Sequence, residues 1–285
     1  MDSIKNVLEI LPSEIRCAAE QFPEEKMEEF RLRAGCPPTV LIEGRERILP
    51  VRTGFGLVTC SDLQEILLGA SEHSAYAVNE TMREGYLTLP GGHRIGICGS
   101  LVKKDGEILS IKEISSLCIR ISREPPLHRC GLLEQLSEPT LILGPPGCGK
   151  TTLLRACIRL LSDSGRRVSV EDDRGEIAAC WRGIPQRNVG VHTDVLTGGE
   201  KKQGMLWLLR TMNPEWIAVD EITSPGDLDA METCSYCGVK LLATAHAGGI
   251  RELSGRPLYQ NLLDLKLFRQ LFILDYKKQF YTERM

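Results

Sequence analysis

The hydrophobic positions of the chain follow two patterns, and the change between them divides the sequence in two. Near the N-terminus, helical spacing predicts an opening helix that carries Ile4, Val7, Leu8, Ile15 and Cys17. The run "PTVLIEG" then predicts a strand, and residues 61–70 predict a helix begun by Ser61, with Glu65 later. In "GYLTLPGGHRIGICGSLVKKDGEILSI", short apolar runs separated by Gly-Gly and Asp-Gly predict antiparallel strands and hairpins. The first part is therefore expected to be α+β.

A proline-punctuated connection, "EPPLHRCGLLEQLSEP" at 124–139, separates the two patterns. After it, strands alternate with helices. The predicted strands are "TLIL", "RRVSVED", "WIAVD" and "VKLLATA", and the predicted helices cover 150–165, 201–212 and 226–237. This alternation predicts an α/β domain with a mostly parallel sheet and helices on both faces. We expect an N-terminal domain at 1–125 and a second domain at 126–285, with ligands at the carboxyl ends of the strands.

The segment between the first of these strands and its helix has the phosphate-loop pattern G-x-x-x-x-G-K-[ST]. Its glycines let backbone N–H groups surround phosphate oxygens, and the helix N-terminus adds positive potential. Lys150 would bridge the β- and γ-phosphates and Thr151 would ligate Mg²⁺. The alternative is a glycine-rich turn before an ordinary helix. The predicted ATP-binding residues are Gly144, Pro145, Pro146, Gly147, Cys148, Gly149, Lys150, Thr151 and Thr152.

Carboxylates follow two other strands. In "WIAVDEI", Asp220 can hold Mg²⁺ through a water shared with Thr151, while Glu221 can polarise an attacking water; an ordinary acidic helix N-terminus is the alternative. In "VEDDRGEIAA", the acidic cluster can coordinate metal, orient water or pair with arginines, or form a solvated turn. This cluster comprises Asp172, Asp173 and Glu176, with Arg174 between them.

The strand "VKLLATA" brings Thr244 and His246 to the same edge. A histidine there can contact a γ-phosphate or the water, or it can be structural. His246 also follows Cys234 and Cys237, which have C-x-x-C spacing, so a zinc or redox site is an alternative to core packing.

Composition limits the function classes. The 285 residues are 42% hydrophobic and 26% charged with a net charge of −3, which indicates a globular chain and argues against a dedicated nucleic-acid binder. No stretch approaches the roughly 18 apolar residues of a membrane span, so the protein is expected to be cytoplasmic or peripheral to a membrane. The eleven cysteines are interpreted as reduced and mostly buried.

Several motifs in order resemble the family of stage III sporulation protein AA, ATPases related to type II and type IV secretion ATPases. They are "GPPGCGKTT", "VEDDRGEIAA", "GIPQRNVGVHTDVL", "GMLWLLRTMNPEWIAVDEI" and "GVKLLATAHAGG", with "EFRLRAGCPP" and "GYLTLPGGHRIGICG" in the first part. Two positions depart from the pattern: His192 stands where the family's Arg is expected, and Thr223 where Gly is usual.

The resemblance implies a RecA-like core, a hexameric ring, and service to membrane-embedded sporulation proteins at the mother-cell face of the forespore membrane. It also implies that Asp172, Asp173 and Glu176 form an Asp box and that His246 is the His-box residue. A ring ATPase completes its site with an arginine from a neighbouring subunit. The candidates are Arg94, which glycines flank, then Arg83 and Arg210, and more weakly Arg31, Arg33, Arg120 and Arg123.

The sequence therefore predicts a Mg²⁺-dependent ATPase that powers assembly or operation of a sporulation-associated membrane channel. Its catalytic residues would be Glu221, Lys150, Glu176, His246, Arg94 and Arg210, and Thr151, Asp220, Asp172 and Asp173 would surround the metal. A nucleic-acid-dependent motor is an alternative, disfavoured by the charge and the 5% aromatic content. A small-molecule kinase is another, which product analysis would separate from an ATPase.

Overall fold

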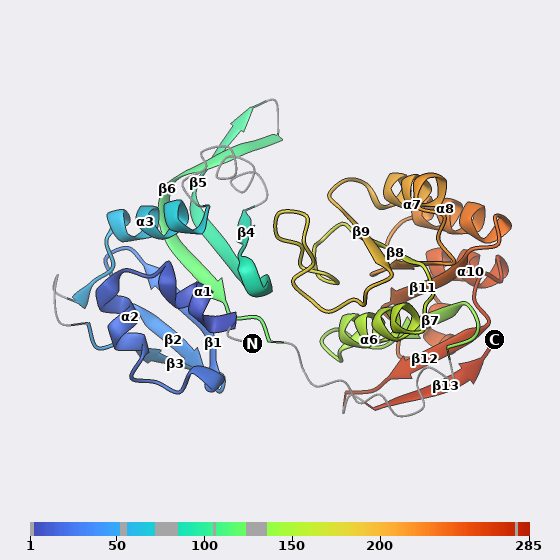
Figure 1. Cartoon of the computed structure of the whole chain (residues 1–285), viewed down its shortest axis with the longest axis horizontal. Helices are drawn as coiled ribbons and strands as arrows, with labels where there is room; N and C mark the ends of the chain where they lie inside the picture. The colour runs from blue at the N-terminus through green and yellow to red at the C-terminus, as the bar shows by residue number, and fades with distance from the viewer. Residues whose placement is uncertain (1–2, 52–55, 72–84, 105–106, 124–135, 277–278) are drawn as a thin grey trace. The chain divides into compact units, whose positions relative to one another are not determined.

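A computed structural model describes residues 3–51, 56–71, 85–104, 107–123, 136–276 and 279–285 (Figure 1). The chain divides into two compact units, Met1–Glu124 and Pro125–Met285. Each unit has its own sheet and its own hydrophobic core.

The first unit is built on a six-stranded antiparallel sheet in the order β3-β2-β1-β6-β5-β4. Buried side chains such as Phe30, Ile95 and Ile119 pack from the sheet against three helices. The strands are β1 (Met27–Arg33), β2 (Thr39–Ile42), β3 (Arg45–Ile48), β4 (Tyr86–Thr88), β5 (Arg94–Lys104) and β6 (Glu107–Arg120). The helices are α1 (Ser3–Glu9), α2 (Ser13–Ala19) and α3 (Cys60–Ala70), with 3₁₀ turns at Glu24–Lys26 and Pro90–Gly92.

Two helix predictions in this unit are wrong in detail. The opening helix is two helices, because Pro12 cannot donate a backbone hydrogen bond and precedes α2 as its N-cap. Helix α3 is capped by Thr59 and not by Ser61, because Thr59 and Asp62 form a reciprocal capping box. Glu65 lies four residues after Ser61, one too far for that motif.

The second unit contains a seven-stranded sheet in the order β13-β12-β7-β11-β10-β8-β9, parallel except for the β12–β13 pair. Its strands are β7 (Thr140–Leu143), β8 (Val168–Asp172), β9 (Thr193–Thr197), β10 (Trp216–Val219), β11 (Lys240–Ala245), β12 (Gln270–Leu274) and β13 (Phe280–Arg284). Its helices are α6 (Lys150–Asp163), α7 (Lys201–Thr211), α8 (Pro225–Tyr236), α9 (Ile250–Leu253) and α10 (Pro257–Asp264). This arrangement confirms the predicted α/β fold class.

Alternation along the strands separates the core of this unit into two layers. In β7, Leu141 and Leu143 face the layer that holds α7, α8 and α10, while Ile142 faces α6. Helices therefore cover both faces of the sheet, as Figure 1 shows for α6 on one side and α7 and α8 on the other. The carboxyl ends of the parallel strands meet at one edge, where polar side chains can gather.

The prediction that the cysteines are mostly buried is wrong. Among the ten cysteines in the described part of the chain, which are all free thiols, only Cys148, Cys157 and Cys234 are buried. The exposed ones are Cys17, Cys36, Cys60, Cys98 and Cys237. Surface positions tolerate a small side chain whatever its polarity, so residue type alone did not predict burial.

Candidate functional site

The segment between β7 and α6 has the geometry of a phosphate-binding loop. At Gly144, a Cβ atom would lie 2.5 Å from Cys148 Sγ, so only glycine fits. Gly147 and Gly149 have φ of 75° and 103°, in the left-handed region that favours glycine. Gly149 is the N-cap of α6, so the backbone N–H groups of the first helical turn open onto this loop.

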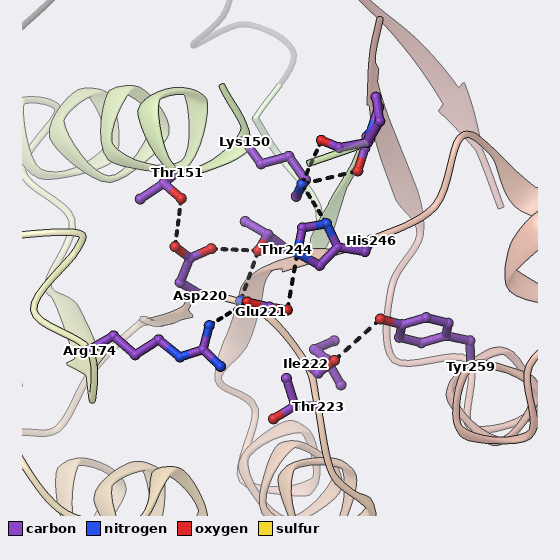
Figure 2. Close-up of polar contacts among 12 residues, drawn as sticks. Lys150, Thr151, Arg174, Asp220, Glu221, Ile222, Thr223, Thr244, His246 and Tyr259 are labelled. Atoms are coloured by element: carbon purple, nitrogen blue, oxygen red, sulfur yellow. Dashed lines mark hydrogen bonds and ion pairs between the residues drawn. The ribbon is translucent and has the colours of Figure 1, made fainter. Parts of the chain in front are cut away.

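Lys150 is buried and turned back toward the loop. Its Nζ donates to the carbonyl oxygens of Gly144 and Pro145, both at 3.0 Å, and lies 2.9 Å from His246 Nδ1 (Figure 2). Burial lowers the pKa of the ammonium, and the nearby negative charges, Asp220 and Glu221 among them, oppose that change. The loop thus holds one cationic side chain where anionic phosphate oxygens would bind.

Asp220, which directly follows β10, holds two hydroxyl groups. Thr151 Oγ1 donates to Asp220 Oδ2 at 2.7 Å, and Thr244 Oγ1 donates to Asp220 Oδ1 at 2.5 Å (Figure 2). The loop hydroxyl and the strand-end carboxylate are therefore in direct contact. Such a set of oxygen donors suits a hard cation such as Mg²⁺.

Glu221 has the left-handed backbone conformation that non-glycine residues rarely adopt, with φ of 49°. Its N–H donates to Thr244 Oγ1 at 2.8 Å. Its carboxylate lies between two cationic or donating groups: Oε2 accepts from Arg174 Nη1 at 2.7 Å, and Oε1 lies 3.0 Å from His246 Nε2. The side chain lies between Arg174 and His246 (Figure 2).

His246 joins Lys150 to Glu221. A lysine ammonium can only donate, so Nδ1 of the ring accepts from it. The ring proton is then on Nε2, which donates to Glu221 Oε1. The loop cation, the imidazole and the carboxylate form one continuous hydrogen-bonded chain.

Lys201, at the start of α7, contacts the backbone of the same site and was not predicted from the sequence. It is 6% exposed, and its Nζ donates at 2.7 Å to the carbonyl oxygens of both Asp220 and Glu221. Asp173 Oδ2 lies 3.8 Å away. The positive charge of a lysine in the first turn of a helix is unfavourable beside the positive end of the helix dipole. This unfavourable placement is the sequence signal that could have indicated a buried, hydrogen-bonded lysine.

Glu171 on β8 is the second residue that was missed. It is 1% exposed, and within the described part of the chain its Oε2 has no hydrogen-bond partner. Burial, reinforced by the charge of Asp173, raises its pKa to about 8, although Lys201 opposes this. Gly204 of α7 packs so closely that a Cβ there would lie 2.7 Å from Glu171 Cγ.

Two members of the predicted acidic cluster make contacts within the turn after β8. The Asp172 carboxylate accepts from the N–H groups of Glu176, Ile177 and Ala178 at 2.8 to 3.0 Å. The Glu176 side chain is exposed, and the Glu176 carbonyl oxygen accepts from Arg155. The structure thus brings Asp173 near Lys201 and uses Asp172 to hold its own loop.

The two departures from the family pattern have local explanations. His192 contacts Ser162 near the C-terminal end of α6, through its N–H at 2.7 Å and its Nδ1 at 2.9 Å. That is about 18 Å along the helix from Lys150. Thr223 does not have a positive φ, so glycine is not required there; its N–H donates to Asp227 Oδ2 at 2.9 Å.

The arginine candidates are mostly engaged near their own strands or helices. In the second unit, Arg210 is exposed and donates to Leu206 O of its own helix. In the first unit, Arg94 lies over the ring of Tyr86 at 4.7 Å. Arg83 lies outside the described residues. The weaker candidates are paired within the first unit: Arg31 and Arg120 with Glu29, Arg33 with Glu46, and Arg123 with the carbonyl oxygens of Glu24 and Met27.

The two cysteines of the C-x-x-C pair lie in different environments. Cys234 is on the buried face of α8, where burial raises the pKa of its thiol to about 11, while Cys237 is exposed at the end of the helix. No group of three or more metal-ligating side chains occurs among the described residues. In the same residues, no helix has the length and hydropathy to cross a membrane.

Comparisons with known proteins agree with the sequence resemblance. A model of the family described as "Sporulation stage III, protein AA" matches residues 1–282. The stage III sporulation protein AA of Bacillus subtilis (strain 168) is 33% identical over 291 residues, covering 96% of this chain and 92% of that protein.

Among solved structures, the pilus retraction motor PilT with bound ADP has a TM-score of 0.62 at 16% identity, covering 94% of this chain and 77% of the other. The Legionella pneumophila ATPase DotB has a TM-score of 0.54 at 17% identity, covering 86% of this chain and 71% of the other. At these identities the likeness shows a shared RecA-like fold and nothing more.

Proposed function

This chain belongs to the family of sporulation stage III, protein AA, and from that premise we propose that it is a Mg²⁺-dependent ATPase. Its hydrolysis would power the assembly or operation of a membrane complex during sporulation. The observation that carries the proposal is the hydrogen-bonded chain from Lys150 through His246 to Glu221, beside the Thr151–Asp220 contact.

Lys150 neutralises phosphate charge in this proposal. Its ammonium contacts two loop carbonyls in the structure, and the β- and γ-phosphate oxygens replace those acceptors when ATP binds. A charged acceptor binds an ammonium more strongly than a neutral carbonyl does, so the exchange is favourable. The lowered pKa of Lys150 rises again as the phosphates arrive.

The Thr151 hydroxyl and the Asp220 carboxylate would hold Mg²⁺, since both are oxygen donors and already touch. When bound, the ion would neutralise charge on the phosphate oxygens. Thr244 keeps the Asp220 carboxylate oriented through its hydroxyl.

Glu221 acts as the general base. Its carboxylate takes a proton from a water molecule whose oxygen forms a bond to the γ-phosphorus, while the bond from that phosphorus to the bridging oxygen breaks and ADP leaves. Arg174 and His246 hold the carboxylate in the structure, and His246 also contacts Lys150. Movement of Lys150 onto ATP therefore changes the hydrogen bonding of the base.

We further propose that the protein works as a ring of six copies, as the family resemblance implies, on the mother-cell face of the forespore membrane. An arginine from a neighbouring copy, with Arg94 as first candidate, would complete each site. Arg94 belongs to the unit without a phosphate loop and begins β5 directly after a glycine-rich turn.

The experiment separates binding from turnover. Lys150→Ala should abolish tight ATP binding. Glu221→Gln should keep binding and reduce phosphate release by a factor of about 100 or more, as expected for loss of a general base. Glu232→Gln is the control, because this residue is on α8 and bonds to exposed Tyr236. Undiminished phosphate release by Glu221→Gln would remove this residue from the mechanism.

A further inference from the structure

A cavity of about 540 Å³ opens beside the phosphate loop, between the turn after β11 and the end of β12. Its walls include Pro145 and Pro146 of the loop and the turn after His246. The opposite wall comes from Ile273 and Leu274 of β12 and from two tyrosines, Tyr276 and Tyr281. All of these residues belong to the second unit.

Sheet order, together with the roles proposed above, gives the direction of a bound nucleotide. Strand β7, which leads into the loop, has β11 on one side and β12 on the other. Asp220 and Glu221 follow β10, beyond β11, so in the proposed function the terminal phosphate and the attacking water would lie on that side. The remaining end of the nucleotide is then directed toward β12, where the cavity begins at the loop prolines.

The cavity has the chemistry of a base-binding site. Tyr276 and Tyr281 are 82% and 51% exposed, and both line the cavity: Tyr276 follows the end of β12, and Tyr281 of β13 is opposite Ile273. Aromatic rings bind nucleobases by stacking, and buried Ile273 and Leu274 supply an apolar floor.

The polar wall is preorganised by one ion pair. Glu252 accepts from Gly248 N at 2.6 Å and pairs with Arg256 at 2.8 Å, while Arg256 Nη1 donates to His246 O at 3.1 Å. These contacts tie the cavity wall to the turn that carries His246. A volume of this size lies within the range of about 300–1,000 Å³ typical of small-molecule sites, which accommodates a base and its sugar.

We propose that this cavity binds the purine base of the nucleoside triphosphate, with Tyr276 and Tyr281 as stacking platforms. The inference rests on the proposed function, since it places the phosphates of the same molecule in the loop. A two-ring purine offers more stacking surface than a pyrimidine, so the cavity also gives a preference for ATP over CTP.

The test compares the double variant Tyr276→Ala/Tyr281→Ala with Tyr236→Ala. Tyr236 is 81% exposed on α8, does not line the cavity, and is thus a control for losing an exposed ring. Dissociation constants are measured with Mg²⁺ for ATP, CTP and inorganic tripolyphosphate, which has no base. The double variant should bind ATP about 10- to 100-fold more weakly and lose its preference over CTP, with tripolyphosphate binding unchanged.

Two outcomes overturn the inference. One is an ATP affinity in the double variant equal to that of Tyr236→Ala, and the other is an equal weakening of ATP and tripolyphosphate. Lys150→Ala distinguishes this failure from failure of the proposed function, because it should lose ATP and tripolyphosphate alike. If Lys150→Ala binds both ligands as the unsubstituted protein does, the phosphate site itself is contradicted.

Discussion

Replacing Lys201 by methionine tests how the base is held in position. The substitution preserves the length of the side chain but removes the ammonium that donates to the carbonyl oxygens of Asp220 and Glu221. A hydrogen bond from a charged donor contributes about 1.5–3 kcal/mol. Glu221 is left-handed, a conformation whose strain of about 1–3 kcal/mol persists only when its surroundings hold it.

Loss of both bonds should therefore lower the free energy of unfolding by about 3–5 kcal/mol, as expected for removing one partner from a buried charge network. Once its backbone is released, Glu221 no longer points at the γ-phosphate, and kcat should fall about 100-fold. The affinity for ATP should fall much less than kcat, because among the described residues no hydrogen bond or ion pair joins Lys201 to the phosphate loop.

Lys202→Met is the matched control. It removes the neighbouring lysine of the same helix, whose ion pair with Asp229 is at the surface, and should leave stability and turnover unchanged. The assays are urea unfolding, steady-state phosphate release and equilibrium binding of ATP. Positioning of Glu221 by Lys201 is contradicted if folded Lys201→Met turns over at the rate of Lys202→Met, or if its ATP affinity falls as much as its kcat.

Three further results are expected. Glu171, with a pKa raised from 4.5 to about 8, binds its proton more tightly in the folded state, so it contributes stability below pH 4.5 that is lost as pH rises toward 8. Glu171→Gln should therefore flatten the dependence of the free energy of unfolding on pH between 4.5 and 8, measured by urea unfolding. An unchanged slope would show that Glu171 does not cause this pH dependence. Asp172→Ala should lower the free energy of unfolding by about 2–4 kcal/mol without weakening Mg²⁺ dependence, whereas a raised Mg²⁺ requirement would return Asp172 to the metal site. Mixing Arg94→Ala with Lys150→Ala chains should restore some phosphate release if Arg94 acts in trans, and a co-assembled but inactive mixture would leave Arg83 or Arg210 to be tested next.

The parts of the site that sequence could predict are those set by local pattern. Lys150 and Thr151 occur in a motif with its own strand and helix, and Asp220, Glu221 and His246 each follow an apolar strand. Parallel strands bring such residues to one edge, so their proximity followed from the alternation of strands and helices. Their catalytic roles remain predictions.

The rest depends on packing between segments far apart in the chain. Lys201 looks like a surface residue in sequence, and it becomes a buried donor only because α7 lies against the turn after β10. Asp172 is indistinguishable from Asp173 until the loop folds over its carboxylate. Strands β9, β12 and β13 were not predicted, and the cavity that borders the last two could not be inferred without them.

Single-turnover hydrolysis in ¹⁸O-labelled water distinguishes ATP hydrolysis at this site from nucleotide binding alone. With the protein in excess over Mg²⁺-ATP, we expect ADP and an equal amount of phosphate that carries one ¹⁸O atom from the attacking water. The same reaction with Glu221→Gln should give bound ATP and little phosphate. ADP formed without labelled phosphate, or labelled phosphate released equally by Lys150→Ala, would contradict the proposal that this site hydrolyses ATP.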